Sequence, residues 1–418
     1  MGQPRVITLG CRLNTFESEV MREIGADAGL EDTIIINTCA VTAEAERQAR
    51  QTIRRTRRDN PDARIIVTGC AAQLNAAAFA SMKEVDRVLG NEEKLNPAIL
   101  GGAGAAVQVA DIMTAGAAAP HLISGFEGRT RAFVQIQQGC DHRCTYCIIP
   151  FARGPNRAIA ADAMIAQVRG LVDAGYLEVV LTGVDICSYG ADVPGGPNLS
   201  GLISQVLTAV PDLARLRLST LDPAVVDDDL IRLFADEARL MPHLHLSLQA
   251  MDDVVLKRMK RRHSRQDAFD VVARIRTLRP DTVFGADLIA GFPTETEPMF
   301  DNTLAAVGDL DLAYLHVFPY SPRPGTPAAR MPEVAAKIRK ARAGRLRTAG
   351  AAGLKRFLES RTGTTAQVLV ENKADGQSRG LSQHYAPVRL DFAAPIGAIV
   401  DARITAAGDD YLLASKAA

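Results

Sequence analysis

The stretch that decides the fold is Gln137-Gln138-Gly139-Cys140-Asp141-His142-Arg143-Cys144-Thr145-Tyr146-Cys147-Ile148-Ile149-Pro150, which holds three of the chain's seven cysteines. Soft sulfur ligands this close together favour zinc, copper(I) or an iron–sulfur cluster. A structural zinc normally takes four protein ligands, so three cysteines favour a four-iron cluster with one iron open to a substrate or cofactor. A zinc site completed by His142, and buried free thiols, are the alternatives. Cys140, Cys144 and Cys147 are termed the loop triad.

Three further cysteines follow predicted strands near the N-terminus. Residues 5–70 alternate apolar strand patterns with polar helical ones, and this βαβαβ order predicts a parallel sheet. The strands run directly into Cys11, Cys39 and Cys70. The carboxyl ends of parallel strands share one sheet edge, where open α/β folds bind ligands. We therefore predict a second three-thiolate metal site, the strand-end triad, and interpret Cys187 as an ordinary free thiol.

Length and composition limit the remaining possibilities. A chain of 418 residues is expected to form two or three domains. It has no apolar run long enough to cross a membrane and no signal peptide, and its clustered cysteines suit a reducing compartment, so we expect a cytoplasmic protein with no membrane partner. The 48 basic residues balance the 48 acidic ones, so any nucleic-acid argument depends on where the charges lie.

Two segments concentrate positive charge. Arg47, Arg50, Arg54 and Arg58 follow helical spacing, and no acid lies between the first and the last of them. This stripe favours a phosphate-facing surface, although a solvated helix face is the alternative. The predicted long helix at 333–361 is also basic on nearly every turn.

An Ala- and Gly-rich stretch at 100–128 marks a domain boundary. Six strand–helix units follow it and predict an open, incomplete barrel. In the fourth strand, period two places His243, His245, Ser247 and Gln249 on one face and three leucines on the other, which indicates a polar, ligand-filled lumen. Histidines with purely structural hydrogen bonds are the alternative.

The C-terminal residues change class again. Four short predicted strands at 365–371, 386–390, 399–404 and 411–414 indicate a small β-barrel, a shape often used for RNA. The predicted fold class is therefore α/β overall. It comprises a parallel βαβ domain at 1–104, a linker at 105–127, an open (β/α)6 partial TIM barrel at 128–360 and a β-barrel at 361–418.

The loop triad resembles the radical S-adenosylmethionine (SAM) signature, C-x3-C-x2-C with an aromatic residue, here Tyr146, before the last cysteine. Together with the strand-end triad and the C-terminal strands, the whole chain resembles a methylthiotransferase. Its sequence motifs are most similar to those of the bacterial enzymes that act on threonylcarbamoyladenosine in tRNA. In the C-terminal strands, residues 380–385 give the best match to a TRAM-like RNA-binding barrel. The motifs that carry this resemblance are residues 8–14, 36–42, 69–73, 140–154 and 316–326.

The resemblance implies two 4Fe-4S clusters and SAM as cofactors. The cluster on the loop triad would bind SAM and cleave it to a 5′-deoxyadenosyl radical that removes hydrogen from a ring C–H. The cluster on the strand-end triad would supply sulfur, methylated by a second SAM. The resemblance also implies SAM contacts, and these are Thr182, Gly183, Ser219, Gln249, Gly291 and Glu295. No catalytic residue beyond the cluster ligands is implied.

The expected partners are the anticodon region of tRNA and a reductant such as flavodoxin or ferredoxin, and the protein is expected to be a monomer. Isopentenyladenosine in tRNA and a ribosomal-protein aspartate are alternative substrates. A non-catalytic, zinc-containing RNA-binding protein is the alternative from another class.

Overall fold

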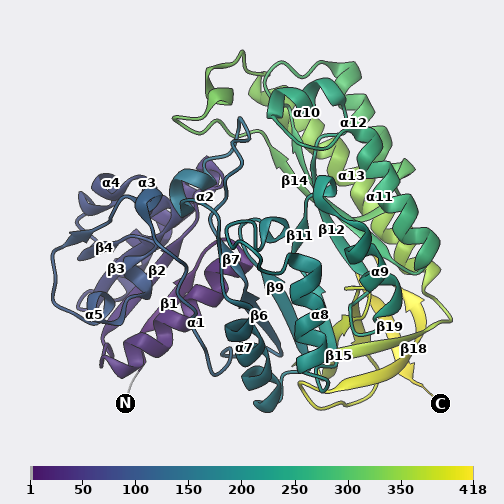
Figure 1. The fold of residues 1–418 in the computed structure, drawn as a ribbon, viewed down its shortest axis with the longest axis horizontal. Helices are drawn as coiled ribbons and strands as arrows, with labels where there is room; N and C mark the ends of the chain where they lie inside the picture. The colour runs from purple at the N-terminus through teal and green to yellow at the C-terminus, as the bar shows by residue number, and fades with distance from the viewer. Residues whose placement is uncertain (1–2, 418) are drawn as a thin grey trace.

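The computed structural model describes residues 3–417, which fall into three successive parts (Figure 1). A parallel sheet with its helices comes first, an open barrel of strands and helices follows, and a closed β-barrel ends the chain. Within the described residues, no helix is long and apolar enough to cross a membrane. The predicted α/β class with these three architectures is confirmed.

The first part is a 5-stranded sheet in the order β1-β2-β3-β4-β5, with every pair parallel. Its strands are β1 (Arg5–Thr8), β2 (Thr33–Thr38), β3 (Arg64–Gly69), β4 (Arg87–Leu89) and β5 (Val107–Gln108). Its helices are α1 (Arg12–Asp27), α2 (Ala43–Asp59), α3 (Cys70–Leu74), α4 (Ala76–Ala80) and α5 (Pro97–Leu100). Strand β5 lies within the segment that was expected to be a linker. The sequence did not predict this strand because its two residues have no strand pattern of their own.

Both faces of this sheet are covered, which explains why β2 contains three consecutive isoleucines. Ile34 and Ile36 pack on one side, in a cluster that contains Ile53 of α2 and Phe79 of α4. Ile35 packs on the other side, in a cluster that contains Met21 of α1. The sheet is therefore a buried scaffold whose free surface for a ligand is its carboxyl edge.

The second part holds the predicted six strand–helix units. Its strands are β6 (Arg131–Gln135), β9 (Glu178–Thr182), β10 (Arg215–Leu218), β11 (Thr220–Leu221), β12 (His243–Gln249), β13 (Val283–Ala290) and β14 (Leu312–Pro319). Its main helices are α7 (Ala161–Asp173), α8 (Leu199–Ala209), α9 (Asp228–Asp236), α10 (Asp253–Met259), α11 (Arg265–Leu278), α12 (Glu297–Asp309) and α13 (Ala336–Ser360). The third predicted strand is interrupted at Ser219, so the strands hydrogen-bond as two parallel sheets, β10-β9-β6 and β11-β12-β13-β14.

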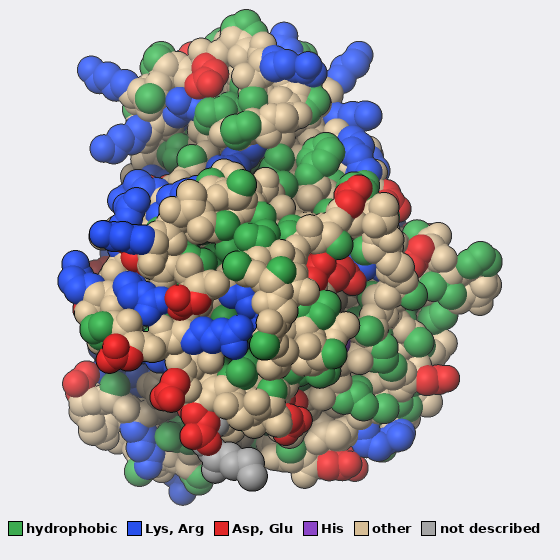
Figure 2. All heavy atoms as spheres, turned by 90° about the vertical axis from the view of Figure 1, so that its left-hand side faces the viewer, with side chains coloured by type: hydrophobic (Ala, Val, Ile, Leu, Met, Phe, Trp, Pro, Cys, Tyr) green, Lys and Arg blue, Asp and Glu red, His purple; other side chains and the backbone are tan. Residues whose placement is uncertain are grey.

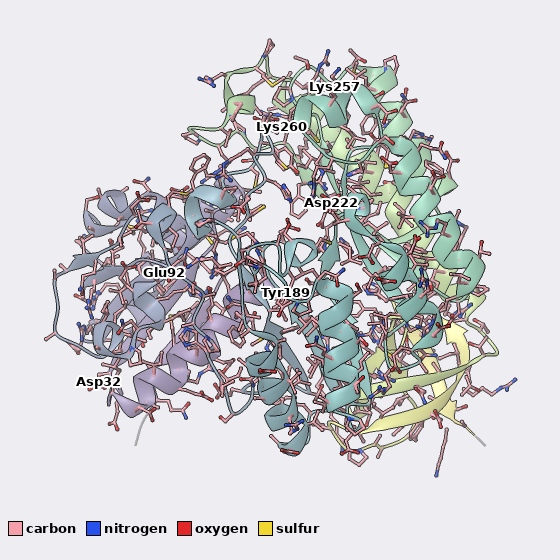
Figure 3. The ribbon with its side chains drawn as sticks, viewed as in Figure 1. Asp32, Glu92, Tyr189, Asp222, Lys257 and Lys260 are labelled. Carbon is pink, nitrogen blue, oxygen red and sulfur yellow. The ribbon has the colours of Figure 1, made fainter. Side chains whose placement is uncertain are left out.

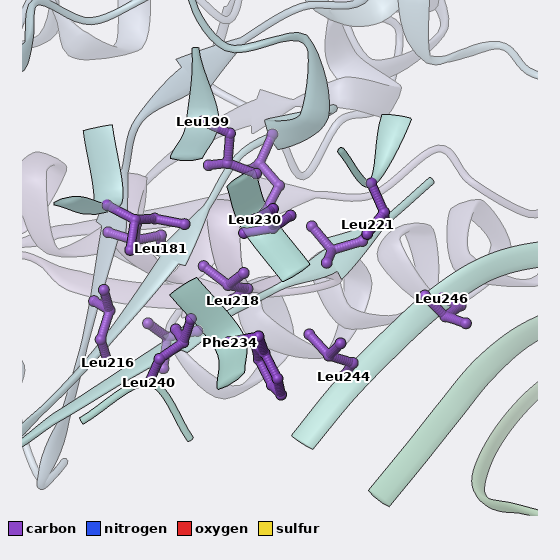
Figure 4. Packing of buried hydrophobic residues seen from close by; sticks show 14 of the residues in the cluster. Leu181, Leu199, Leu216, Leu218, Leu221, Leu230, Phe234, Leu240, Leu244 and Leu246 are labelled. Atoms are coloured by element: carbon purple, nitrogen blue, oxygen red, sulfur yellow. The ribbon is translucent and has the colours of Figure 1, made fainter. Parts of the chain in front are cut away.

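Strand β12 alternates as its sequence predicts. Leu244, Leu246 and Leu248 are buried in the main hydrophobic core, and Figure 4 shows Leu244 beside Phe234 of α9. His243 and His245 are also buried, but they lie on the opposite, lumen face, where their rings meet other polar rings. The leucines therefore attach the strand to the outer helices and leave a polar lumen.

The third part is a closed barrel in the order β15-β16-β17-β19-β18. Its strands are β15 (Thr365–Ala374), β16 (Gln377–Ser382), β17 (Pro387–Leu390), β18 (Ile399–Ala407) and β19 (Leu412–Lys416). Strand β16 is absent from the prediction because it is polar and contains glycine. Gly380 is needed there, since a Cβ at this position would lie 2.0 Å from the carbonyl oxygen of Leu369.

A loop of the third part closes the floor of the lumen. The Tyr385 ring stacks on His243 with 4.8 Å between ring centroids, and the Arg12 guanidinium at the start of α1 donates to its hydroxyl at 3.1 Å. Arg217 of β10 donates to the carbonyl oxygens of Ser382 and Gln383, both at 2.9 Å. All three parts of the chain therefore meet at Tyr385.

Candidate functional site

The loop triad lies between β7 (Gln137–Gln138) and α6 (Ile149–Arg153) in a loop with no regular structure of its own. Thr145 fixes the loop to the second part: its backbone N–H donates to Met259 O at 3.0 Å and its hydroxyl to Arg258 O at 2.8 Å. The N–H of Cys140 donates to Gly154 O at 3.0 Å. These contacts hold three half-buried thiols on one loop, as a shared metal centre requires.

Gly139 allows this loop to form. Its φ is +72°, and a Cβ there would lie 1.7 Å from the carbonyl oxygen of Pro155. We expect Gly139→Ala to displace the loop and to lose the iron predicted for the loop triad, measured as iron per chain. The control is Gly128→Ala, whose φ is +65° but whose Cβ would meet nothing within 4 Å. It carries only the backbone cost of about 1–2 kcal/mol and should keep its iron. Full iron in both variants would contradict this prediction.

The surroundings of Cys140 and Cys147 favour their neutral thiol forms until a metal binds. Burial raises the pKa of Cys147 to about 12. Burial also raises the pKa of Cys140 to about 12, and the carboxylate of Asp185, 3.9 Å from its sulfur, adds to this shift. The Arg261 guanidinium lies 3.8 Å from the Cys144 sulfur. A metal that binds these cysteines must therefore displace the thiol protons, as thiolate-binding metal ions do.

The strand-end triad is brought together as the sheet predicts. Cys11 is the N-cap of α1, Cys39 follows β2, and Cys70 begins α3 directly after β3. The approach is close: a Cβ on Gly10 would lie 2.8 Å from the Cys39 Cβ and 3.1 Å from its sulfur. Burial raises the pKa of Cys39 to about 11, with smaller contributions from the nearby thiols of Cys70 and Cys11. Cys11 is the exposed member.

Arg153 links the two triads and was not identified from the sequence. It ends α6, the helix that begins two residues after Cys147, and its Nε donates to the Cys70 sulfur at 3.0 Å. Ile148 and Ala152, at the two ends of this segment, pack in the same cluster as Cys70. The chain that leaves the loop triad therefore runs directly against the strand-end triad.

The charge of Arg153 is balanced within a buried network. Its NH2 donates to Glu17 Oε2 at 3.0 Å, and Lys94 Nζ donates to the same oxygen at 2.6 Å. Lys94 also donates to Asn91 Oδ1 at 2.8 Å. Burial alone would raise the pKa of Glu17, but the charges of Arg153 and Lys94 outweigh it and lower that pKa to about 2. Glu17 is therefore a buried anion that holds two cations in place.

The six expected SAM-contacting residues all follow, or lie near, the carboxyl ends of lumen strands. Thr182 and Gln249 end β9 and β12, and Ser219 separates β10 from β11. A Cβ on Gly183 would lie 2.8 Å from Gln137 Oε1, so backbone is all that fits at this point. Gly291 directly follows β13 and has a φ of +73°. Their roles in cofactor binding stay predictions.

Glu295 is engaged by the outer helix. Its Oε2 accepts a hydrogen bond from the Gly291 N–H at 2.8 Å and another from Arg342 of α13, also at 2.8 Å. Burial raises the pKa of Glu295 to about 7, although the Arg342 charge opposes this shift. The carboxylate thus stabilises the turn after β13 and connects it to α13. Its expected contact with SAM remains a prediction.

Two carboxylates near the loop triad were missed by sequence analysis. Asp222, directly after β11, forms an ion pair with Arg261 at 3.2 Å and lies centrally in the molecule (Figure 3). Arg261 also donates to the carbonyl oxygen of Ser247 at 2.7 Å. Asp185 pairs with His142 at 2.9 Å, which engages the side chain considered as a fourth zinc ligand. The only sequence feature that marks Arg261 is the run of basic residues after α10, and this run does not predict a contact with a cysteine sulfur.

The arginine stripe on α2 is less available for phosphate than its sequence suggests. Arg47 pairs with Glu44 at 2.6 Å, and Arg50 pairs with Glu46 at 3.2 Å while its guanidinium lies over the Phe79 ring. On α13, Arg342 and Arg345 pair with acids of α12. Lys and Arg side chains instead stand out at the upper end of the face in Figure 2, and exposed Lys257 and Lys260 lie at the top of the molecule in Figure 3.

Comparison with known proteins agrees with this architecture. Residues 134–307 match the radical SAM superfamily model, and residues 4–90 match the model described as Uncharacterized protein family UPF0004. Among solved structures, the radical SAM methyltransferase TsrM from Kitasatospora setae has a TM-score of 0.56 at 16% identity, covering 78% of this chain and 74% of that one. The fold is thus that of a radical SAM protein, and the loop triad lies within the matched residues.

Close relatives give the family. The threonylcarbamoyladenosine tRNA methylthiotransferase MtaB of Rickettsia prowazekii is 48% identical over 97% of this chain and 96% of its own length. The protein of the same name from Aquifex aeolicus is 33% identical over 94% and 98%. A tRNA-2-methylthio-N(6)-dimethylallyladenosine synthase from Erythrobacter litoralis is 34% identical over 98% and 96%. The chain therefore belongs to the radical SAM methylthiotransferase family.

Proposed function

We propose that the protein is a tRNA methylthiotransferase that adds a methylthio group to the adenine ring of N6-threonylcarbamoyladenosine next to the anticodon. One observation carries the choice of substrate: the chain is 48% identical to the Rickettsia relative named for that nucleoside and 34% identical to the relative named for dimethylallyladenosine. Both alignments span nearly the whole chain, so the difference does not arise from coverage.

The two sets of thiols fit two four-iron clusters. Each offers three soft ligands from a single loop or a single sheet edge, and each would leave one iron without a protein ligand. The loop triad would hold the cluster that binds SAM, with Thr182, Gly183, Ser219, Gln249, Gly291 and Glu295 in the surrounding rim. When bound, the two clusters would supply the electron that cleaves SAM and the sulfur that is added to the adenine ring carbon.

The chain's own residues hold the two centres in fixed relation. Arg153 donates to the Cys70 sulfur at 3.0 Å, so it fixes the position of that sulfur at the sheet edge. Arg261 places a second guanidinium beside Cys144 and is itself fixed by Asp222 and Ser247. The loop around Tyr385 closes the lumen floor, where its ring stacks on His243 and its hydroxyl accepts from Arg12.

The remaining assignments follow from this function. We assign residues 1–104 to the domain of the strand-end triad, 105–127 to a linker that also contributes β5 to the sheet of that domain, 128–360 to the radical SAM core and 361–418 to a TRAM-like barrel that binds RNA. The protein acts as a monomer in the cytoplasm, where its tRNA is found. A small reductant such as flavodoxin or ferredoxin supplies the electrons.

Nucleoside mass spectrometry tests the substrate. In bacteria that lack the gene, 2-methylthio-N6-threonylcarbamoyladenosine is expected to disappear from tRNA, and its unmethylthiolated precursor should accumulate. Expression of the wild-type chain restores the modified nucleoside, whereas the Cys144→Ala chain does not. Restoration of the dimethylallyl-type nucleoside instead would assign the alternative tRNA substrate. An unchanged nucleoside profile would contradict the proposed function.

A further inference from the structure

The lumen face of β14 carries a ladder of aromatic rings. Because side chains alternate along a strand, Tyr314, His316 and Phe318 share one face. The first two meet lumen residues: the Tyr314 ring lies 5.4 Å from that of His243, and the His316 ring lies 4.5 Å from that of His245, both between centroids. Strand β14 is also the last strand of its sheet, so the ladder stands at the open edge of the barrel.

This ladder becomes exposed toward the rim. Leu312 and Ala313 at the start of β14 are buried, whereas the His316 side chain is 61% exposed and Phe318 is 37% exposed. The His316 ring is nevertheless fixed, because its Nδ1 lies 3.1 Å from Asp287 Oδ1 and the same oxygen lies 3.0 Å from His245 Nε2. An oriented, exposed ring beside an exposed phenylalanine has a free π face.

A cation and a hollow lie beside the ladder. A cavity of about 320 Å³, near the lower limit of ordinary ligand sites, runs between β14 and α13 and is lined in part by Tyr314, His316, Arg347 and Gly350. Arg347 is exposed, and its NH2 donates to the Val317 carbonyl oxygen at 3.2 Å. In residues 3–417, Arg347 forms no ion pair with an acid, unlike Arg342 and Arg345 on the same helix.

Aromatic faces beside an unpaired cation are what a single-stranded nucleic acid requires. Unpaired RNA bases stack on Phe, Tyr and His rings, while arginines meet the phosphates. We propose that the open edge of β14 seats an unpaired base of the tRNA loop, stacked on His316 and Phe318, with its phosphate at Arg347. This inference rests on the proposed function, because it takes the substrate to be RNA, and it adds the surface that holds an unpaired base at the rim of the barrel.

Fluorescence of a labelled RNA tests the proposal without any turnover. A synthetic anticodon stem-loop carries 2-aminopurine, an adenine analogue quenched by stacking, at each unpaired loop position in turn. The reconstituted wild-type protein is mixed with it anaerobically without reductant. Quenching at one or more positions is expected. His316→Leu and Phe318→Leu should remove that quenching and weaken binding about tenfold, the loss of roughly one stacking contact. His316→Phe should retain both.

Controls separate the possible outcomes. Phe269→Leu removes a half-buried ring of α11 that packs against the main core under Arg265, and it should bind like the wild type. Arg347→Gln should weaken binding and flatten its salt dependence while it leaves quenching at saturation unchanged. If the leucine variants quench and bind like the wild type, or if they lose SAM binding alone, the stacking inference is overturned and the proposed function stands. A wild-type protein that does not bind the RNA would overturn both.

Discussion

The Cys144→Ala and Cys70→Ala proteins are expected to be equally inactive in methylthiolation but to fail in different ways. Each should retain one cluster, so iron falls from about eight to about four atoms per chain. Cys144→Ala should form no 5′-deoxyadenosine from SAM with dithionite, because we propose that the cluster on the loop triad binds and reduces SAM. Cys70→Ala should still form it, because the change leaves the loop triad intact and removes a ligand only from the proposed sulfur-supplying centre.

The matched control is Cys187→Ala, the same change at the one cysteine outside both triads. The Cys187 sulfur accepts a hydrogen bond from the Asp222 N–H at 3.2 Å, so the variant loses a modest interaction, but both clusters should remain. Iron and sulfide analysis, together with 5′-deoxyadenosine quantification, distinguishes the three proteins. If Cys70→Ala keeps all its iron, or if Cys144→Ala still cleaves SAM, the assignment of two separate centres is wrong. Zinc without sulfide in the wild type would indicate the non-catalytic alternative.

Features with a local pattern could be predicted from the sequence. The spacing of Cys140, Cys144 and Cys147 is visible within eight residues, and the strand-end triad follows because each cysteine ends a strand of one parallel sheet. The polar lumen is predictable from the alternation in β12. Short or polar strands such as β5 and β16 were missed because pairing with neighbouring strands, rather than their own residues, defines them.

Contacts between distant residues leave no such pattern. In the sequence, Arg153 looks like an ordinary arginine at the end of a helix. Its partners cannot be predicted from neighbouring residues, because the cysteine it contacts is 83 positions away and its carboxylate partner is 136 positions away. The arginine stripe shows the opposite error: it appeared unpaired because the search for acids covered only the segment between its ends, whereas Glu44 and Glu46 lie just before it. Charge patterns along a sequence therefore predict a surface poorly unless the partners contributed by the fold are known.

The buried pair of Arg153 and Glu17 yields the largest expected effect on stability. Arg153→Met should lower the free energy of unfolding by about 3–5 kcal/mol, because it leaves Glu17 in the interior with only Lys94 as a charged partner. Urea denaturation under anaerobic conditions measures this change. The control is Arg47→Met, which breaks the exposed pair with Glu44 and should cost at most about 1 kcal/mol. A similar cost for both variants would show that burial does not determine the effect.

Two further measurements identify the origin of the loss. If the missing partner charge is responsible, adding Glu17→Leu to Arg153→Met should cost far less than the sum of the two single changes. The pKa of Glu17 is lowered to about 2, so its stabilising contribution is present above the ordinary carboxyl pKa near 4.3 and should be lost as the pH falls toward 2. Arg153→Met should therefore weaken this acid dependence. Because Arg153 also donates to the Cys70 sulfur, the variant should lose iron from the strand-end triad while the loop triad still cleaves SAM. A purely structural role for Arg153 would instead destabilise the protein and leave both clusters occupied.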